Sequence, residues 1–484
     1  MAKINAIEMR DEVDRVKQEF EQLCASGKVT PEIKAVVDSL LIVVALIMAI
    51  FMERKTPKNS KNSSIPPSQT DADDTSTGKP RRKGKGKKVD GEISNTRVRK
   101  SVTLLDVTSC GSCGDALDDV PCSGVERRTR IDIIFEKVVD HYDAEIKQCP
   151  NCGAQTKGQF PDNMPGNLQY GNGLKAFIIH LIISQMVALN RVQKQVQAMI
   201  GEVLSEASLL KFVLRLHQAL ETWENQAIET ILRSPTTNVD ETSYKVEKEK
   251  YWIHVYSAGG TTLKLLHRKR GREAIEELNI IPRYFGVIIH DCWGSYLSYK
   301  HCGHGLCGSH LLRELTFIFE SNQYRWAKNI KRLLKDTCRI VASRESKCLT
   351  AKEYANLQKR YRNILTRGSK ELPELPPRPK GKRGKMAQSD AQNLWDRLKK
   401  YEASVLLFAK VGHVPFTNNR AERDLRMAKV KQKVSGCFRK KQYAEAYCRI
   451  SSYLQTMASQ GINPLVAIQM ALEGKFPAPE AGGE

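Results

Sequence analysis

The sequence lacks the features of a secreted or membrane-spanning protein. Residues 1–28 are polar and helix-like, without an apolar core before a small-residue cleavage site, so we expect no secretory signal peptide. The one strongly apolar run, residues 40–52, is shorter than the ~20 residues that a membrane-spanning helix needs. We expect a buried or oligomerising helix there, no membrane as partner, and a cytoplasmic protein.

Disulfide bonds are not expected either, although the chain has 13 cysteines. The count is odd, and paired Cys-x-x-Cys motifs in a reducing compartment indicate metal ligands. Two such pairs offer the four thiolates that tetrahedral Zn²⁺ prefers: Cys110, Cys113, Cys149 and Cys152. The strand-like stretch 126–139 between them could form a zinc-ribbon hairpin, with Cys122 as a spare ligand. The alternative is that these cysteines are reduced and free.

Acidic residues are outnumbered, with 54 Asp and Glu against 77 Lys and Arg and a formal charge of +23. An excess of this size indicates a polyanionic partner, because the release of counterions drives binding to nucleic acid. The basic residues occur in blocks along most of the chain, such as the run at 79–88, which favours DNA over a charge that serves only solubility.

Composition and periodicity divide the chain into segments. Residues 6–24 and 31–52 have helical patterns, whereas 56–100 has too few apolar residues to form a core. Short β-rich runs occupy 236–246, 250–257, 262–267 and 284–290, and helical patterns return at 311–365, 388–410 and 419–473. We predict six parts: an N-terminal helical region 1–55, a basic flexible linker 56–100, a zinc-finger-like module 101–160, a helical DNA-binding or connecting domain 161–233, a catalytic domain 234–440, and a C-terminal helical segment 441–484.

Two aspartates occupy special places in the β-rich part. Asp240 lies within the first run, and because side chains alternate along a strand, Glu241 must face the other way. Asp291 follows the apolar run 284–290 directly, at the carboxyl end of a buried strand, where ligand sites collect in α/β sheets.

A third acid, Glu422, lies near the start of a helix that Thr417, Asn418 or Asn419 could cap. Three clustered carboxylates raise one another's pKa and become stable as anions when divalent cations lie between them. Mg²⁺ or Mn²⁺ suits such oxygen ligands, and two metals can serve a phosphodiester displacement. The alternative for any one acid, Glu422 above all, is a solvated surface charge.

Two cations follow Glu422 on the same helix. Arg426 lies one turn and Lys429 two turns further along, and either could hold a DNA phosphate beside the metals. The rings of Trp252, Trp293 and Tyr296 could stack on a base, although core packing is the simpler role.

A second metal site is conceivable around Cys302, Cys307 and His310, with His301 or His304 nearby. A cysteine and a histidine at a helix start more often pack against the core, and we interpret them in that way. His290 and Cys292, which flank Asp291, are interpreted as packing residues or as support for the metal ligands.

Several blocks resemble one known family. Residues 58–68 (KNSKNSSIPPS) are similar to the linker of the insertion sequence 66 family of bacterial transposases, and the two Cys-x-x-Cys-Gly motifs resemble its zinc-finger region. Its catalytic blocks are similar to residues 239–242, 290–296, 307–314, 418–426 and 434–439. The blocks cover nearly the whole chain in the family's order. The N-terminal part departs, because 40–52 is almost uncharged where the family shows a charged, coiled-coil-like segment.

The resemblance implies a multidomain α/β protein with a ribonuclease-H-like catalytic core and a triad of Asp240, Asp291 and Glu422. The separation of 131 positions from Asp291 to Glu422 implies a mostly helical insertion at about 311–410. The implied protein is a nucleoid-associated bacterial enzyme that binds terminal inverted repeats, cuts and joins DNA, and acts at least as a dimer. Accessory proteins of the same element are a further partner that the resemblance allows. The alternatives are a catalytically silent, zinc-containing DNA-binding protein derived from a transposase, and a nuclease that cuts without joining.

Overall fold

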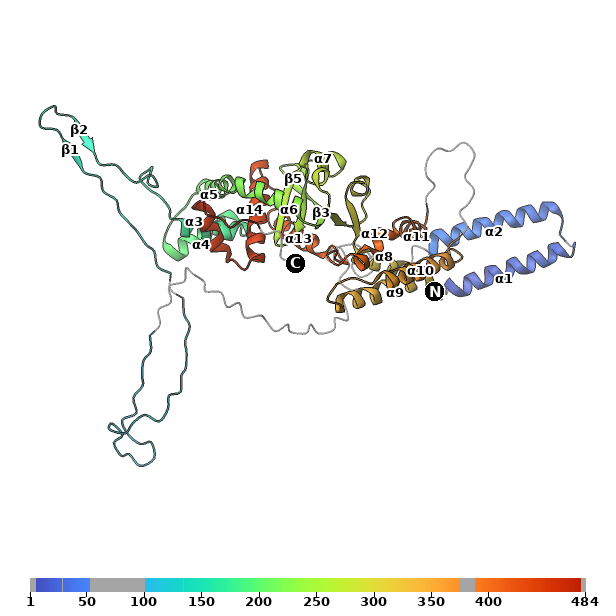
Figure 1. Ribbon diagram of the computed structural model, residues 1–484, viewed down its shortest axis with the longest axis horizontal. Coiled ribbons are helices and arrows are strands. Elements are labelled where there is room, and N and C mark those ends of the chain that lie inside the picture. Colours follow the sequence, from blue (N-terminus) through green and yellow to red (C-terminus); the bar gives the residue numbers. More distant parts are fainter. Residues whose placement is uncertain (1–5, 28, 53–100, 134, 374–387, 480–484) are drawn as a thin grey trace.

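The computed structural model describes residues 6–27, 29–52, 101–133, 135–373 and 388–479 (Figure 1). They form a mixed α/β structure. Its N-terminal part is a pair of helices, α1 (Ala6–Ala25) and α2 (Pro31–Met52), as the sequence predicts. None of the helices in the described ranges is long and apolar enough to cross a membrane. The predicted linker 56–100 lies outside the described residues.

Residues 101–160 contain one short hairpin, β1 (Ile146–Gln148) and β2 (Gln155–Lys157). The prediction of a strand at 126–139 was wrong for the residues described there. Its apolar side chains remain in solvent, Ile131 at 92% and Ile133 at 72% exposure, and no neighbouring strand supplies the backbone partners that a strand needs. The hairpin instead encloses the second Cys-x-x-Cys pair.

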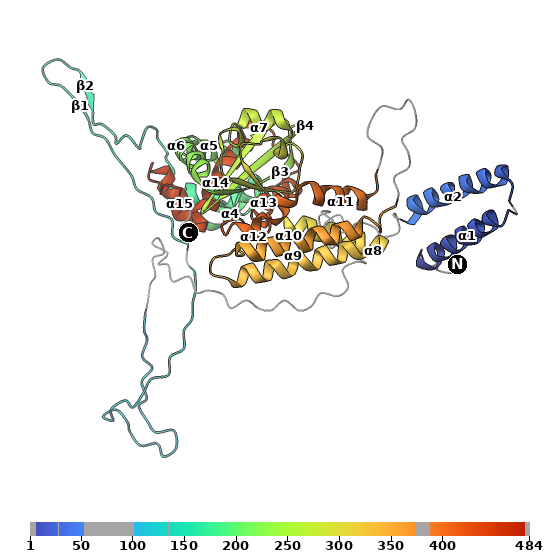
Figure 2. The same cartoon turned by 45° about the vertical axis from the view of Figure 1, so that its right-hand side comes forward.

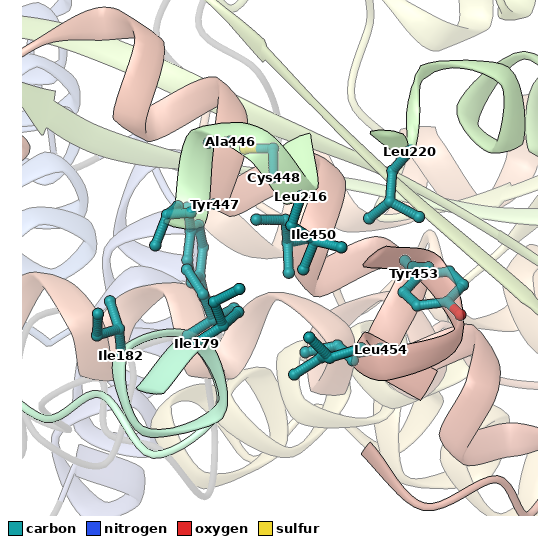
Figure 3. Close-up of a cluster of buried hydrophobic side chains, with 14 of the residues drawn as sticks. Ile179, Ile182, Leu216, Leu220, Ala446, Tyr447, Cys448, Ile450, Tyr453 and Leu454 are labelled. Atoms are coloured by element: carbon teal, nitrogen blue, oxygen red, sulfur yellow. The ribbon is translucent and has the colours of Figure 1, made fainter. Parts of the chain in front are cut away.

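Helices from both ends of the remaining chain share one hydrophobic core. It joins α3 (Asn172–Ile183), α4 (Leu189–Ile200) and α5 (Glu206–Ala219) to α14 (Lys441–Ser459) and α15 (Pro464–Leu472). Figure 3 shows Ile179 of α3 and Leu216 of α5 against Tyr447 and Ile450 of α14. The predicted segments 161–233 and 441–484 are therefore packed together, although more than 200 residues separate them.

The central sheet has the order β5-β4-β3-β6-β7. Strands β3 (Thr236–Val246), β4 (Glu249–Ala258) and β5 (Thr261–His267) are antiparallel, whereas β6 (Val287–His290) and β7 (Gly303–Leu306) continue the sheet parallel to β3. The first four strands lie at the predicted β-rich runs.

Strand β7 was not predicted, because two of its four residues are glycines, which have low β-propensity. A Cβ atom at Gly305 would lie 2.5 Å from Cδ1 of Ile289, so glycine there permits β7 to pair closely with β6.

Helices cover both faces of this sheet. Ile253 and Val255 of β4 pack with α14 and with α13 (Asn419–Ser435) on one face. Tyr256 and Ala258 belong to a second cluster on the other face, with α6 (Glu221–Arg233) and α7 (Arg272–Leu278).

A helical insertion follows β7 and has its own core. It comprises α8 (Gly308–Asn322), α9 (Arg325–Ser343), α10 (Ala351–Gly368), α11 (Asp390–Lys400) and α12 (Glu402–Lys410). Figure 2 shows α8, α9, α10 and α12 as a layer beside the sheet. The described helices lie where the sequence predicts helices, and α12 returns the chain to β7, so that α13 can pack across β3.

Candidate active site

The pairing of β3 with β6 brings Asp240 and Asp291 together. These parallel strands pair Thr236 with Val287 and Asn238 with Ile289. The same offset, carried two residues further, sets Asp240 against Asp291. Paired strands lie only about 4.8 Å apart, and residues two apart on a strand share a face. The two predicted aspartates therefore meet where β6 ends.

Glu241 faces away from this pair, as the alternation predicts. Its buried carboxylate accepts hydrogen bonds from the Arg270 guanidinium at 2.7 Å and from the Tyr296 hydroxyl at 2.8 Å. The Arg270 guanidinium also lies over the rings of Trp252 (5.0 Å) and Trp293 (4.4 Å). Trp252, Trp293 and Tyr296 thus have protein partners in this structure, which supports the packing role.

The turn after β6 is built to present Asp291. The Trp293 amide donates to Asp291 Oδ1 at 3.1 Å, and the Cys292 amide donates to His290 Nδ1 at 3.2 Å. Cys292 has φ +73°, a left-handed conformation that non-glycine residues rarely adopt and that often marks functional sites. His290 is fully buried and lies 3.2 Å from His304 Nδ1, and burial lowers its pKa to about 3. His290 and Cys292 thus support the turn.

Asn418 fixes the helix of Glu422 to the strand of Asp240. It occupies the N-cap position of α13, but its side chain makes no capping hydrogen bond to that helix. Its Nδ2 donates to the Val239 carbonyl at 2.8 Å, and its Oδ1 accepts from Asn238 Nδ2 at 2.9 Å. Because Asn418 is buried and lies one helical turn before Glu422, these bonds set the distance between α13 and β3.

A second set of bonds holds the rest of this helix on the sheet. Asp424, two residues after Glu422, accepts from Ser257 at 2.7 Å and from Thr262 at 2.9 Å. The Arg420 guanidinium donates to the Gly259 and Thr261 carbonyls at the β4–β5 turn. The first two turns of α13 therefore contact β3, β4 and β5 through polar bonds.

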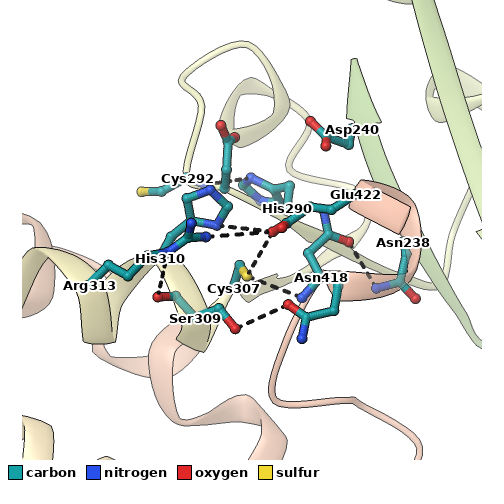
Figure 4. Close-up of polar contacts among 12 residues, drawn as sticks. Asn238, Asp240, His290, Cys292, Cys307, Ser309, His310, Arg313, Asn418 and Glu422 are labelled. Carbon is teal, nitrogen blue, oxygen red and sulfur yellow. Dashed lines mark hydrogen bonds and ion pairs between the residues drawn. The ribbon is translucent and has the colours of Figure 1, made fainter. Parts of the chain in front are cut away.

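The Glu422 carboxylate lies among residues from the start of α8. Its Oε1 lies 3.5 Å from His310 Nδ1, 3.9 Å from Cys307 Sγ and 4.0 Å from the Arg313 guanidinium (Figure 4). The sequence suggests Cys307 and His310 as partners of Cys302, with His301 or His304 nearby, and it gives no link to Glu422. Their place in a block that resembles the family's catalytic blocks was the available signal.

The charges of the other two acids act on Asp240, although the three acids are not among the groups of described residues whose metal-binding atoms all lie within 4.8 Å of one another. Burial raises the pKa of Asp240 well above its usual value, and the charges of Glu241, Asp291 and Glu422 raise it further. Such a shift means that the carboxylate lacks a compensating cation among the neighbouring side chains. Hard divalent cations fit this set of oxygens, with Asp240, Asp291 and Glu422 as the residues that would hold them.

The two predicted phosphate-binding cations differ in their surroundings. Arg426 is exposed on α13. Lys429 donates from Nζ to the Ser243 carbonyl of β3 at 2.7 Å, and burial lowers its pKa. In this structure Lys429 fastens α13 to β3, whereas Arg426 remains accessible to a ligand.

The four predicted zinc ligands form two matching turns but no common site. In each Cys-x-x-Cys-Gly motif the first cysteine's carbonyl accepts from the glycine amide, Cys110 from Gly114 and Cys149 from Gly153. Backbone amides also lower the pKa of the first thiols, that of Cys110 to about 7. Within the described part of the chain, however, only Cys307, His310 and Glu422 place three metal-binding atoms within 4.8 Å of one another.

Comparison with known proteins adds one match. A family model described as "Transposase IS66 family" matches residues 167–446, which is more than half of the chain and contains both aspartates, Glu422 and the whole insertion. No curated protein matches the chain.

Proposed function

Because this chain belongs to the IS66 family of transposases, we propose that it binds the terminal inverted repeats of an insertion sequence and cuts and joins DNA with the triad Asp240, Asp291 and Glu422. The observation that carries the proposal is the convergence of these acids from β3, the end of β6 and α13. The mixed sheet, with three antiparallel strands and two parallel ones, supports a ribonuclease-H-like core.

The three carboxylates would hold Mg²⁺ or Mn²⁺. When bound, two such ions supply charge stabilisation to the attacking and leaving oxygens of a phosphodiester displacement. The protein's own part is to place the acids: the β3–β6 register sets Asp240 beside Asp291, and Asn418 sets the first turn of α13 against β3. Exposed Arg426, one turn beyond Glu422, is placed to contact a phosphate of the bound strand.

DNA as the partner is supported by where the charge lies. Residues 325–410 contain 23 Lys and Arg but 8 Asp and Glu, so this part of the insertion holds most of the chain's net charge of +23. On α9, Arg325, Lys328, Arg332, Lys335 and Arg339 are exposed at spacings of three and four residues. They form one stripe, which we call the α9 basic stripe, about 21 Å long at 1.5 Å per residue.

The α9 basic stripe lies on the helix that packs against α8. Helix α9 packs against α8, and α8 contributes His310 and Arg313 at Glu422. DNA that lies along the stripe would thus extend from the acids. We further propose that the chain acts as at least a dimer on DNA, with structural zinc in the 101–160 module.

The test is strand cleavage and strand transfer with a DNA end of the element. Asp240→Asn, Asp291→Asn and Glu422→Gln are each expected to abolish both reactions while end binding stays near the wild-type level. Glu320→Gln, an acid on α8 outside the triad, is the control and should keep activity. Mg²⁺-dependent joining by any triad variant contradicts the proposal, and cutting without joining by the wild type identifies a nuclease instead.

A further inference from the structure

The residues around Glu422 have the composition of a transition-metal site. Cys307 ends the link from β7 to α8, His310 lies one turn into α8, and Glu422 comes from α13. One sulfur, one nitrogen and one oxygen atom lie within 4.8 Å of one another. Figure 4 shows the three side chains converging from these separate elements. Sulfur and nitrogen ligands favour Zn²⁺-like ions over Mg²⁺.

The distances fit the size of such a site. Bond lengths of about 2.3 Å to sulfur and 2.0–2.2 Å to nitrogen and oxygen put neighbouring ligand atoms of a tetrahedral Zn²⁺ site about 3.3–3.6 Å apart. The structure has His310 Nδ1 at 3.5 Å and Cys307 Sγ at 3.9 Å from Glu422 Oε1. These two distances lie within a few tenths of an ångström of that range, and the sulfur and nitrogen atoms lie within 4.8 Å of each other.

His310 gives a second, independent indication. Its Nδ1 is buried and makes no hydrogen bond in the described structure, and buried polar atoms without a partner are costly. This nitrogen atom forms an ion pair with Glu422 Oε1 at 3.5 Å, a separation that a metal ion between the two atoms would also fit. The Cys307 Sγ accepts a hydrogen bond from the Asn418 amide at 3.1 Å and donates to Glu422 Oε1 at 3.9 Å, so a bound metal ion would take the place of the thiol proton.

We infer that Cys307, His310 and Glu422 bind one transition-metal ion of the Zn²⁺ class, with a fourth position open. The contacts of the Glu422 carboxylate with His310, Cys307 and Arg313 all use Oε1. The other oxygen is therefore left for the divalent cations of the proposed triad, and the transition metal fixes α13 against α8. The Arg313 guanidinium lies 4.0 Å from the same oxygen.

This inference shares Glu422 with the proposed function, but metal binding itself requires only these three side chains. The experiment is a titration of the full-length protein with Co²⁺, which replaces Zn²⁺ and reports thiolate ligands by its charge-transfer absorption. Cys307→Ser and His310→Ala are each expected to bind one Co²⁺ fewer than the wild type. Cys302→Ser, a buried cysteine five residues earlier, is the matched control and should bind the wild-type number.

Two further variants separate this site from the others. Asp240→Asn should retain the Co²⁺ ion even where strand joining is lost, so that the two proposals can fail independently. Cys110→Ser should lose only Co²⁺ bound by the 101–160 module. The inference is overturned if Cys307→Ser and His310→Ala, folded by circular dichroism, both bind as many Co²⁺ ions as the wild type.

Discussion

Asn418 connects two acids that are 182 residues apart in the sequence, Asp240 and Glu422. It has no proton to transfer and no charge with which to hold a metal. Its effect is geometric, since it bonds to the backbone next to Asp240 and begins the helical turn that presents Glu422. A residue of this kind is a positioning residue, and its loss is expected to affect the chemical step more than DNA binding.

We predict that Asn418→Ala slows strand cleavage about 100-fold, the scale expected when reacting groups shift by about 1 Å. It also leaves Asn238 and the Val239 carbonyl buried without partners, at a cost of about 1–3 kcal/mol each. Single-turnover cleavage and DNA affinity would be measured together. Asn419→Ala removes a neighbouring, exposed amide whose Oδ1 accepts a hydrogen bond from Ser309, and it should act like the wild type. Equal rates in the two variants would contradict the assigned role.

Lys264 illustrates a different effect of burial. It is fully buried on β5, its Nζ donates to Ser451 at 3.2 Å, and burial lowers its pKa to about 8 from 10.5. Between these values the unfolded chain binds more protons than the folded one, so the free energy of unfolding rises with pH through this window. The lowered pKa thus costs stability below pH 8, and this cost disappears as the pH approaches 10.5.

Lys264→Met removes this pH dependence. The stability of the wild type relative to the variant should increase by about 3 kcal/mol between pH 7 and pH 10.5, at 1.36 kcal/mol per pKa unit. Denaturant unfolding followed by tryptophan fluorescence would measure the difference. Lys211→Met, at an exposed position, is the control. Curves for wild type and Lys264→Met that run parallel across this range would show that Lys264 is not responsible.

At the scale of elements, the helical insertion combines a buried and a basic face. Helix α9 buries Trp326, Ile330, Leu333 and Leu334, while the α9 basic stripe occupies the exposed positions between them. Within the stripe, Asp336 pairs with Arg332 at 3.7 Å and with Arg339 at 3.1 Å. Such exposed pairs contribute little stability, so the stripe can exchange them for phosphates at small cost.

We predict that Lys328→Gln, Arg332→Gln and Lys335→Gln together weaken DNA binding and flatten its salt dependence. Each lost phosphate contact changes the slope of log K against log salt by about 0.9, so the triple variant should lose up to about 2.7. Fluorescence anisotropy at several salt concentrations measures this slope. The charge-retaining triple Lys328→Arg, Arg332→Lys and Lys335→Arg should keep the wild-type slope. An unchanged slope in the glutamine variant would place the DNA elsewhere.

At the scale of the whole molecule, one sheet joins two cores. Helices α3, α4, α5, α14 and α15 form one core with α13 on one face of the sheet. The helices of the insertion form the other core, which includes residues of β6 and β7. The acids lie where these parts meet, since α13 is the element that follows the insertion and crosses β3. Under the proposed function, repulsion among the acids is opposed by the packing of the whole domain and would be relieved by bound cations.

Divalent cations should accordingly stabilise the entire domain. A free Mg²⁺ concentration 100-fold above Kd is expected to add about 2.7 kcal/mol to the wild type. Asp240→Asn with Asp291→Asn should raise the melting temperature without metal and abolish the response to Mg²⁺. Thermal unfolding by circular dichroism, with Glu320→Gln as control, measures both. A double variant that still responds like the wild type would exclude these acids as the main Mg²⁺ ligands.

The sequence by itself determined the local elements and the order of the blocks. The strands at β3, β4, β5 and β6 and the helices around them lie where hydrophobic periodicity puts them, because short-range patterns decide which faces can be buried. The same patterns placed Asp240 on a strand and Asp291 at a strand end. The prediction of a strand at 126–139 was wrong because the described apolar side chains of this segment pack against no other element.

Only the tertiary structure decided which residues that are distant in the sequence become neighbours at the site. The neighbours of Glu422 come from residues more than 100 positions earlier, Cys307 and His310, and Asn418 bonds to strand residues about 180 positions away. No local pattern encodes such pairs, because they depend on sheet order and on how the insertion returns the chain to the sheet. The acids were therefore readable from the sequence, whereas their supporting residues and the inferred transition-metal site required the fold.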